Sequence, residues 1–354
     1  MNISLPVLET GPVRPDFARG PASLEAVSLL RISVTDRCNL RCVYCMPDEG
    51  VDFGPADELL SPDDFYAVAE AAASVGVQHF KLTGGEPTVR RDLPAIIERL
   101  ASLGPEDLSL TTNGLLLHRM AGPLRRAGLD RLTISWDTMK PDRFDQLARG
   151  GARALGGLDG LRRGIEAALE AGFEKLKFNV VVMGGDNDDE IVDFARLSLD
   201  HPWTVRFIEY MPLGDSTLIE QDPAGIGGAF TVDNEQIQSR IAAALGPLAP
   251  ADRDTEAGVG PAQVYRLADA RGRLGFISAM SRPFCESCNR LRLTATGELR
   301  SCLFDGGELS ILPALETSAD ARRAHLIDLM HRCVSLRPHT HSPRGNRAMS
   351  QVGG

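Results

Sequence analysis

Short apolar segments and longer amphipathic segments alternate along the chain between about residues 30 and 211. The apolar segments predict strands at 30–34, 80–82, 108–112, 132–136, 176–182 and 204–210. Helices are predicted between them, one with Ser61 as its N-cap and Pro62 in its first turn, and others at 95–103, 115–127, 158–171 and 188–199. Six strand–helix units in succession indicate a parallel sheet with helices packed outside it.

Polar side chains and glycines follow nearly every predicted strand at its carboxyl end. They lie in the segments 83–86 and 111–114 and at Ser135, Asn179 and Glu209. A complete or partial barrel and a doubly wound sheet both accommodate this order of elements. A doubly wound sheet gathers its functional residues at one switch point, whereas a barrel distributes them around one face. The distribution in this sequence therefore favours a barrel.

The alternation breaks down after about residue 212. Helices are predicted at 234–244 and 325–334, a strand pair at 263–267 and 273–278, a loop at 245–260 and a polar tail at 336–354. We therefore divide the chain into a loosely ordered leader at 1–27, a core barrel at 28–245 and a C-terminal region at 246–354. The segment 215–229 is turn-rich.

The charge balance limits the partners that the chain can bind. The sequence has 38 basic and 48 acidic residues, so its formal net charge is −10. This disfavours a nucleic acid polymer or an anionic membrane, but not a small phosphorylated ligand held by a few arginines. No apolar run reaches 18 residues, and the leader lacks the features of a targeting peptide. We therefore expect a cytoplasmic protein that does not bind a membrane.

Three cysteines, Cys38, Cys42 and Cys45, follow the first predicted strand directly and form the first triplet. Three thiolates in one loop can hold three irons of a [4Fe–4S] cluster and leave the fourth iron open. The alternative is a zinc site, which needs a fourth ligand. No histidine occurs before residue 79, so a local fourth zinc ligand is missing.

A second triplet consists of Cys285, Cys288 and Cys302. It again supplies three thiolates, which indicates a second cluster with an open iron. The alternative is a structural zinc site completed by one of the later histidines, His325, His331, His339 or His341. The seventh cysteine, Cys333, falls in a predicted helix, where a buried structural thiol is expected.

Arg290 and Arg292 come directly after Cys288, in a segment with strand alternation, NRLRL. Alternation places both guanidinium groups on one face, where they could bind a phosphate chain. The alternative is a solvated edge strand.

The first triplet, with Tyr44 directly before its last cysteine, resembles the cysteine loop of the radical S-adenosylmethionine (SAM) superfamily. The turn at 84–87, GGEP, is similar to the glycine-rich SAM-binding turn of that superfamily. The second triplet, the segments 206–211 (RFIEYM) and 289–293, and the terminal Gly353 and Gly354 together resemble the GTP 3′,8-cyclase family within it.

The resemblance implies an α/β fold, a partial (β/α)6 TIM-like barrel with a C-terminal extension that carries a second iron–sulfur cluster. It implies a lyase that uses a 5′-deoxyadenosyl radical and catalyses the first step of molybdenum cofactor (molybdopterin) biosynthesis. The products are 3′,8-cyclo-7,8-dihydro-GTP, 5′-deoxyadenosine and methionine. The implied cofactors are two [4Fe–4S] clusters and SAM.

The resemblance also assigns residues to ligands. The two triplets would hold the two clusters. Contacts with SAM are implied for Tyr44, Gly85, Ser135 and Met211. Contacts with GTP are implied for Arg31, Lys81, Thr111, Lys177, Arg206, Arg290 and Arg292. Catalytic roles are implied for Arg31, Gly353 and Gly354. Lys81 stands where the family often has arginine, so it lacks a bidentate fork. Trp136, beside Ser135, is unusual.

The implied partners are GTP, an external electron donor, a second copy of the chain in a homodimer, and cyclic pyranopterin monophosphate synthase, which would receive the product. Two rival interpretations are a peptide-modifying radical SAM enzyme and a non-enzymatic iron–sulfur or zinc scaffold. The first would require a peptide-binding domain in a leader that is too short for one. The second leaves the GGEP turn and the terminal glycines without a role.

Overall fold

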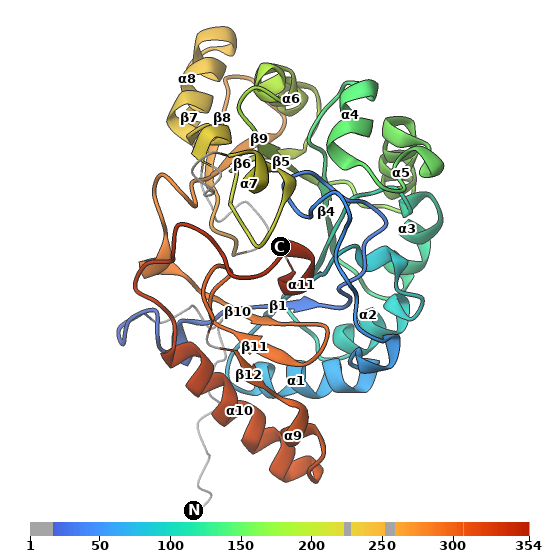
Figure 1. Cartoon of the computed structure of the whole chain (residues 1–354), viewed down its shortest axis with the longest axis vertical. Coiled ribbons are helices and arrows are strands. Elements are labelled where there is room, and N and C mark those ends of the chain that lie inside the picture. Colours follow the sequence, from blue (N-terminus) through green and yellow to red (C-terminus); the bar gives the residue numbers. More distant parts are fainter. Residues whose placement is uncertain (1–16, 223–227, 252–258, 307, 354) are drawn as a thin grey trace, which may run out of the picture.

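The computed structural model describes residues 17–222, 228–251, 259–306 and 308–353, and the statements below refer to these residues. The sequence alternation becomes a curved parallel sheet with helices on its outer face (Figure 1). Its strands are β1 (Leu29–Ser33), β2 (His79–Thr83), β3 (Asp107–Thr112), β4 (Arg131–Ser135), β5 (Lys177–Val182) and β6 (Thr204–Glu209). The helices between them are α1 (Pro62–Ser74), α2 (Leu93–Ala101), α3 (Leu117–Arg126), α4 (Pro141–Ala148), α5 (Gly157–Glu170) and α6 (Ile191–Asp200). The predicted partial barrel is confirmed.

Strands of the C-terminal region extend this sheet at both edges. They are β7 (Ala249–Pro250), β8 (Gln263–Arg266), β9 (Arg273–Ile277), β10 (Arg290–Leu293), β11 (Glu298–Arg300) and β12 (Leu309–Ser310). The strand order is β12-β11-β10-β1-β2-β3-β4-β5-β6-β9-β8-β7. β10 pairs in parallel with β1, and β9 pairs in parallel with β6. The chain from β9 to β10 must therefore pass from one edge of the partial barrel to the other, and this connection contains Cys285 and Cys288.

The two faces of the sheet carry different kinds of side chain. Outward residues such as Phe80, Leu132 and Phe178 are buried in the apolar core beneath the helices. Their neighbours in sequence include Lys81, Thr133 and Asn179, which alternation turns to the opposite face. A barrel whose inward side chains are apolar fills its own interior. Here the inward side chains are polar and line cavities instead.

Several local predictions agree with the structure. Ser61 Oγ accepts a hydrogen bond from the Asp64 backbone N–H, and the Asp64 carboxylate accepts one from the Ser61 backbone N–H. These two bonds form a capping box at the start of α1. Helix α8 (Asn234–Leu245) lies where a helix was predicted. Cys333 is fully buried in the apolar core. Trp136 packs edge-on against Phe178 and Phe194, so it belongs to the layer between sheet and helices.

Other predictions were incomplete. Helix α4 was not predicted, although it buries Phe144 and Leu147. Helix α10 (Ala319–Ser335) begins six residues earlier than position 325, because its polar first turns give no apolar periodicity. The turn-rich segment contains α7 (Thr217–Gln221), and α9 (Leu312–Leu315) is a further short helix. The expected polar tail ends in α11 (Met349–Val352), whose Ser350 and Val352 are buried. The end of the tail therefore packs inside the molecule.

Arg290 and Arg292 do not lie on an edge strand, since β10 is paired on both sides, with β1 and with β11. Within the described ranges, no helix is long and apolar enough to cross a membrane.

Candidate active site

Two cavities inside the barrel meet between the two cysteine triplets. The first pocket is lined by Cys38, Cys42 and Cys45, and the second by Cys285, Cys288 and Cys302. They contain about 1160 and 1130 Å³ of empty space, including the part open to solvent, which suffices for nucleotide-sized ligands. The residues shared by both linings are Thr111, Asn179, Ile208, Met211 and Leu303. Ligands in the two pockets could therefore lie against each other.

The first triplet lies in the loop after β1. The Leu40 backbone N–H donates to Cys38 Sγ at 3.4 Å, and Asn113 Nδ2, beyond the end of β3, donates to Asn39 Oδ1 at 2.8 Å. Burial is the main reason that the pKa values of all three thiols are raised, that of Cys45 to about 12. Without a metal cluster these thiols therefore stay protonated at neutral pH.

The glycine-rich turn packs directly against that loop. Gly84 has a φ of +152°, and a Cβ there would collide with the Thr35 carbonyl oxygen. A Cβ at Gly85 would collide with the Arg37 carbonyl in the same way. The turn can approach so closely only because both positions lack side chains. Both glycines line the first pocket.

The buried carboxylate of Glu86 connects this turn to β3. It accepts hydrogen bonds from the Thr88 backbone at 3.0 Å, from Thr112 Oγ1 at 2.7 Å and from the Asn113 backbone at 2.6 Å. Burial raises the pKa of Glu86 above its usual value, while these donors lower it. Glu86 thus holds the ends of two neighbouring strands in a fixed arrangement at the pocket.

Tyr44, a predicted SAM contact, is held by a residue that the sequence analysis missed. Its hydroxyl donates to Asp137 Oδ2 at 2.9 Å, although the two residues are 93 positions apart. Asp137 Oδ1 accepts from the Val181 backbone at 2.9 Å, and burial raises the pKa of Asp137 to about 6. Both Tyr44 and Asp137 line the first pocket with Ser135, Gly85 and Met211.

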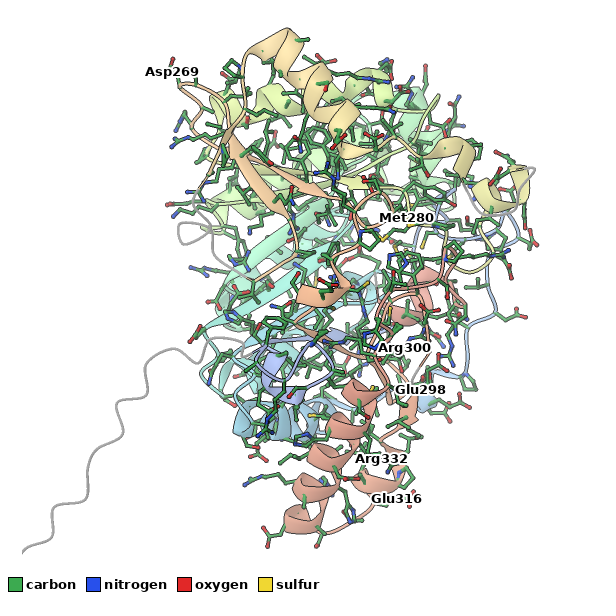
Figure 2. All side chains as sticks on the ribbon, turned by 90° about the vertical axis from the view of Figure 1, so that its left-hand side faces the viewer. Asp269, Met280, Glu298, Arg300, Glu316 and Arg332 are labelled. Carbon is green, nitrogen blue, oxygen red and sulfur yellow. The ribbon has the colours of Figure 1, made fainter. Side chains whose placement is uncertain are left out.

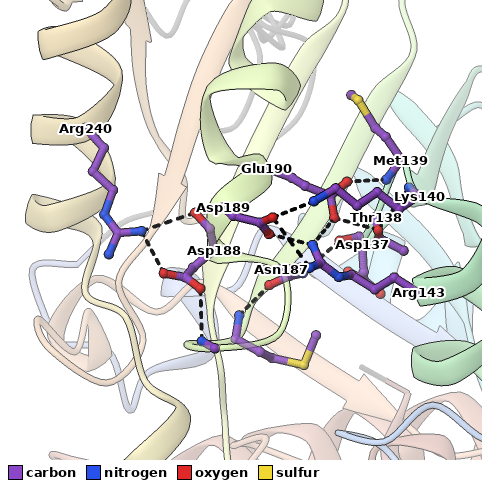
Figure 3. Close-up of polar contacts among 12 residues, drawn as sticks. Asp137, Thr138, Met139, Lys140, Arg143, Asn187, Asp188, Asp189, Glu190 and Arg240 are labelled. Carbon is purple, nitrogen blue, oxygen red and sulfur yellow. Dashed lines mark hydrogen bonds and ion pairs between the residues drawn. The ribbon is translucent and has the colours of Figure 1, made fainter.

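The loop that carries Asp137 is anchored to the end of β5 (Figure 3). Asn187 Nδ2 donates to the backbone carbonyls of Asp137 and Val181, at 2.7 and 2.8 Å. Glu190, almost fully buried, accepts from Thr138 Oγ1 and from the Met139 backbone, each at 2.6 Å. These contacts fix the wall of the first pocket after β4.

The second triplet has a cationic environment. Arg290 Nη2 donates to Cys288 Sγ at 3.5 Å, and Arg337 donates to the backbone carbonyls of Cys288 and Arg290. Burial alone would raise the pKa of Cys288, but the charges of Arg290 and Arg337 lower it to about 6. Burial raises the pKa of Cys285. The two triplets therefore differ in charge environment as well as position.

Cationic side chains gather in the second pocket. The predicted GTP contacts among its lining residues are Arg31, Lys81, Thr111, Arg206, Arg290 and Arg292. No carboxylate occurs in that lining within the described part of the chain. Burial, and then the charge of Arg290, lowers the pKa of Arg292 to about 9, so it remains cationic at neutral pH. A pocket lined by several cationic side chains and no carboxylate is suited to a polyanion.

Lys81 and Arg206 share one acceptor that was not predicted. Lys81 Nζ and Arg206 Nη2 donate to the hydroxyl of Thr133 at 3.1 and 3.2 Å. Lys177, another predicted GTP contact, lies outside the second pocket. It lines a smaller adjoining cavity, which shares Lys81 and Arg206 with the second pocket. The cationic surface therefore continues toward the amino ends of the strands.

The C-terminal tail lies between the two pockets. Arg292 Nη1 donates to the Gly353 carbonyl at 2.8 Å, and Gly353 has a φ of +71°. A Cβ at Gly353 would lie about 3.0 Å from Thr83, which lines the first pocket. The structure therefore places Gly353 among residues of both pockets. Gly354 lies outside the described residues, as do residues 1–16 of the leader.

Both triplets fit iron–sulfur clusters better than a single metal ion. Thiolates around one zinc lie about 4 Å apart, and among the described residues no three histidine, cysteine, aspartate or glutamate side chains form such a group. Instead, the thiols line pocket walls with space beside them. Donors also point at the sulfur atoms of Cys38, Cys45 and Cys288, as is typical of cluster ligands.

A partial barrel with a three-cysteine loop after its first strand and a glycine-rich turn after its second defines a radical SAM enzyme. The radical SAM superfamily model matches residues 32–198, and the Molybdenum Cofactor Synthesis C model matches residues 203–343. GTP 3′,8-cyclase of Pelotomaculum thermopropionicum is 45% identical over 93% of this chain and 98% of the relative. That of Moorella thermoacetica is 44% identical over the same shares. The chain belongs to the GTP 3′,8-cyclase family.

A solved structure supports the fold. The alignment with Streptococcus suis SuiB bound to S-adenosylmethionine covers 83% of this chain and 65% of the SuiB chain. The TM-score is 0.55, and the two sequences are 14% identical. At this identity the likeness shows the fold alone.

Proposed function

We propose that the chain converts GTP and SAM into 3′,8-cyclo-7,8-dihydro-GTP, 5′-deoxyadenosine and methionine, the first step of molybdenum cofactor biosynthesis. One structural observation supports this proposal in addition to the family membership. The two pockets meet, each contains one cysteine triplet, and their charges are opposite. This arrangement supports two different ligands that would meet at a shared wall.

The charges match the two ligands. The charged residues that line the first pocket are Glu86 and Asp137, with no lysine or arginine among its described lining. SAM carries a sulfonium and an ammonium group, which carboxylates stabilise. The second pocket presents arginines and Lys81 to the triphosphate of GTP. We propose that Tyr44, Gly85, Ser135 and Met211 contact SAM.

When bound, the first cluster and SAM would supply the radical chemistry that abstracts hydrogen from C3′ of the GTP ribose. The first triplet would hold that cluster, and the second triplet would hold the other cluster beside the guanine. We propose that Arg31, Arg206, Arg290 and Arg292 fix the triphosphate, with Lys81, Thr111 and Lys177 as further contacts. Holding both the guanine and the triphosphate would place the ribose of GTP at the wall shared by the two pockets. The fixed orientation of the ribose would accelerate the reaction.

The tail would close the space between the ligands. Arg347 forms ion pairs with Glu298 and Glu308 at 2.5 and 2.8 Å, and this anchors the segment before α11. Gly353 then reaches the wall beside Thr83 and Ser33 without a side chain to fill it. We propose that Gly353 and Gly354 exclude water from the reacting groups and that Arg31 acts there as a catalytic cation.

The remaining proposals concern organisation and partners. We propose a core barrel at 28–245 and a C-terminal region at 246–354, in a chain that forms a homodimer. An external donor would supply the electron, and cyclic pyranopterin monophosphate synthase would receive the product.

An anaerobic assay of the reconstituted protein with dithionite, SAM and GTP tests the function. We expect 5′-deoxyadenosine and a cyclised GTP product. Absence of 5′-deoxyadenosine would exclude radical SAM chemistry. Deoxyadenosine without any cyclised GTP would leave that chemistry in place and exclude GTP as the substrate.

A further inference from the structure

The first pocket has one wall that comes from the opposite end of the chain. Ser350 and Met349 of α11 line it together with the first triplet. Ser350 is 1% exposed, so its side chain is enclosed by the protein and the pocket rather than by solvent. Neither the resemblance to the radical SAM family nor the sequence pattern indicated a role for this residue.

The backbone of Ser350 contacts the first triplet directly. Its N–H donates a hydrogen bond to Cys45 Sγ, and this bond lowers the pKa of Cys45 against the larger raising effect of burial. Hydrogen bonds to ligating sulfur atoms help to set the properties of iron–sulfur clusters. The contact therefore places Ser350 beside the site where the first cluster and SAM would be held.

The hydroxyl of Ser350 has no hydrogen-bond partner among the described residues, although it is buried. Buried hydroxyl groups nearly always have a partner, and one that lacks it requires an explanation. The Ser350 hydroxyl belongs to a residue that lines a pocket able to hold a polar ligand. A ligand in the first pocket would supply the missing partner.

The helix that carries Ser350 is fixed from both sides. Before it, Arg347 pairs with Glu298 and Glu308, and Glu298 is labelled in Figure 2 near Arg300. Arg300 in turn donates to Asn346 Oδ1 at 2.9 Å. After the helix, the Gly353 carbonyl accepts from Arg292. Because these contacts flank one short helix, its residues are held in place at the pocket before a ligand arrives.

We propose that Ser350 is a SAM-binding residue: its hydroxyl hydrogen-bonds SAM in the first pocket while its backbone N–H holds Cys45. This deepens the proposed function and rests on it. The consequence is that the SAM site is complete only when the C-terminal helix is seated. Because Arg292 of the second pocket also binds this tail, the same segment contacts both sites.

Binding measurements on the reconstituted holoenzyme test the proposal. The variant is Ser350→Ala, and Gln351→Ala is the matched control, because Gln351 is the next residue and lines neither pocket. Ser350→Thr retains the hydroxyl. SAM affinity would be measured by equilibrium dialysis, GTP affinity in parallel, and iron content in each preparation. The electron paramagnetic resonance spectrum of the reduced first cluster would be recorded with and without SAM.

We expect Ser350→Ala to bind SAM about five- to tenfold more weakly, the usual effect of losing one hydrogen bond from a binding site. Its iron content and GTP affinity should match wild type, and SAM should perturb its spectrum only at higher concentration. Gln351→Ala should behave as wild type, and Ser350→Thr should recover most of the affinity. Unchanged SAM affinity in Ser350→Ala, or a loss that follows lost iron, would overturn the proposal. Wild-type protein that fails to bind SAM would instead contradict the proposed function.

Discussion

The two cysteine triplets are similar in sequence but differ in their surroundings. The first lies in one loop, its thiols have raised pKa values, and the charged residues of its pocket are carboxylates. The second spans the connection between β9 and β10 and the region after β11, and arginines lower the pKa of Cys288. Three thiolates alone do not determine a ligand. We propose that the charged residues beside each triplet distinguish a pocket for a cationic ligand from a pocket for an anionic one.

A cationic pocket is compatible with the acidic composition of the whole chain. A net charge of −10 disfavours a nucleic acid polymer or an anionic membrane, but not a small phosphorylated ligand. Arg31, Arg206 and Arg292 lie inside the barrel around one pocket. Only the local distribution of charge bears on the ligand. A change in one pocket should therefore affect one ligand more than the other.

Replacing a cysteine of the first triplet and replacing a cysteine of the second should abolish different products of the reaction. Cys42→Ala should abolish formation of 5′-deoxyadenosine, because the first cluster lacks a ligand. Cys288→Ala should abolish the cyclised product but retain the first cluster and its cleavage of SAM. Iron content, deoxyadenosine and product would be quantified in the same reactions. Identical losses in both variants would show that the pockets do not have separate roles.

Deleting Gly353 and Gly354 should reduce cyclisation by about 100-fold or more, because small displacements of reacting groups have large effects on rate. Iron content should stay near wild type, since neither residue is a ligand. The measurement is product formation per iron-loaded protein. Normal turnover by the shortened chain would rule out a catalytic role for the tail.

Arg290→Ala should weaken GTP binding by about 10- to 100-fold, the effect expected for a lost charge-assisted contact with phosphate. SAM affinity should stay unchanged. Arg282→Ala is the matched control, because Arg282 lies on the same connection but is exposed and pairs with Glu235. Equal GTP affinities for the two variants would contradict the assignment of the second pocket.

Thiol reactivity in the cluster-free protein should differ by about tenfold or more at pH 7, because the thiolate is the reactive form. With a pKa of about 6, Cys288 is mostly thiolate at pH 7, and its alkylation should slow as the pH falls through 6. With a pKa of about 12, Cys45 should react faster only as the pH rises above neutral. Peptide mapping after timed iodoacetamide treatment would measure both rates. Parallel pH profiles would contradict the electrostatic difference.

Much of the barrel could be predicted because each strand is a short apolar segment with polar residues next to it in the sequence. β3, β5 and β6 begin and end within one residue of their predicted limits. The contacts between strands were not predictable, because they depend on topology. Asp137 reaches Tyr44 across 93 residues only when the end of β4 faces the loop after β1. The sequence of the C-terminal tail is polar, so its burial beside Cys45 could not be predicted. That burial depends on the ion pairs of Arg347 with Glu298 in β11 and with Glu308 before β12.

The central claim is that the two pockets bring SAM and the GTP ribose together. The most direct test uses GTP labelled with deuterium at C3′ in an anaerobic reaction with SAM and dithionite, followed by mass spectrometry of 5′-deoxyadenosine. The account predicts that the deoxyadenosine gains one deuterium. Deoxyadenosine that stays unlabelled while GTP is consumed would contradict it.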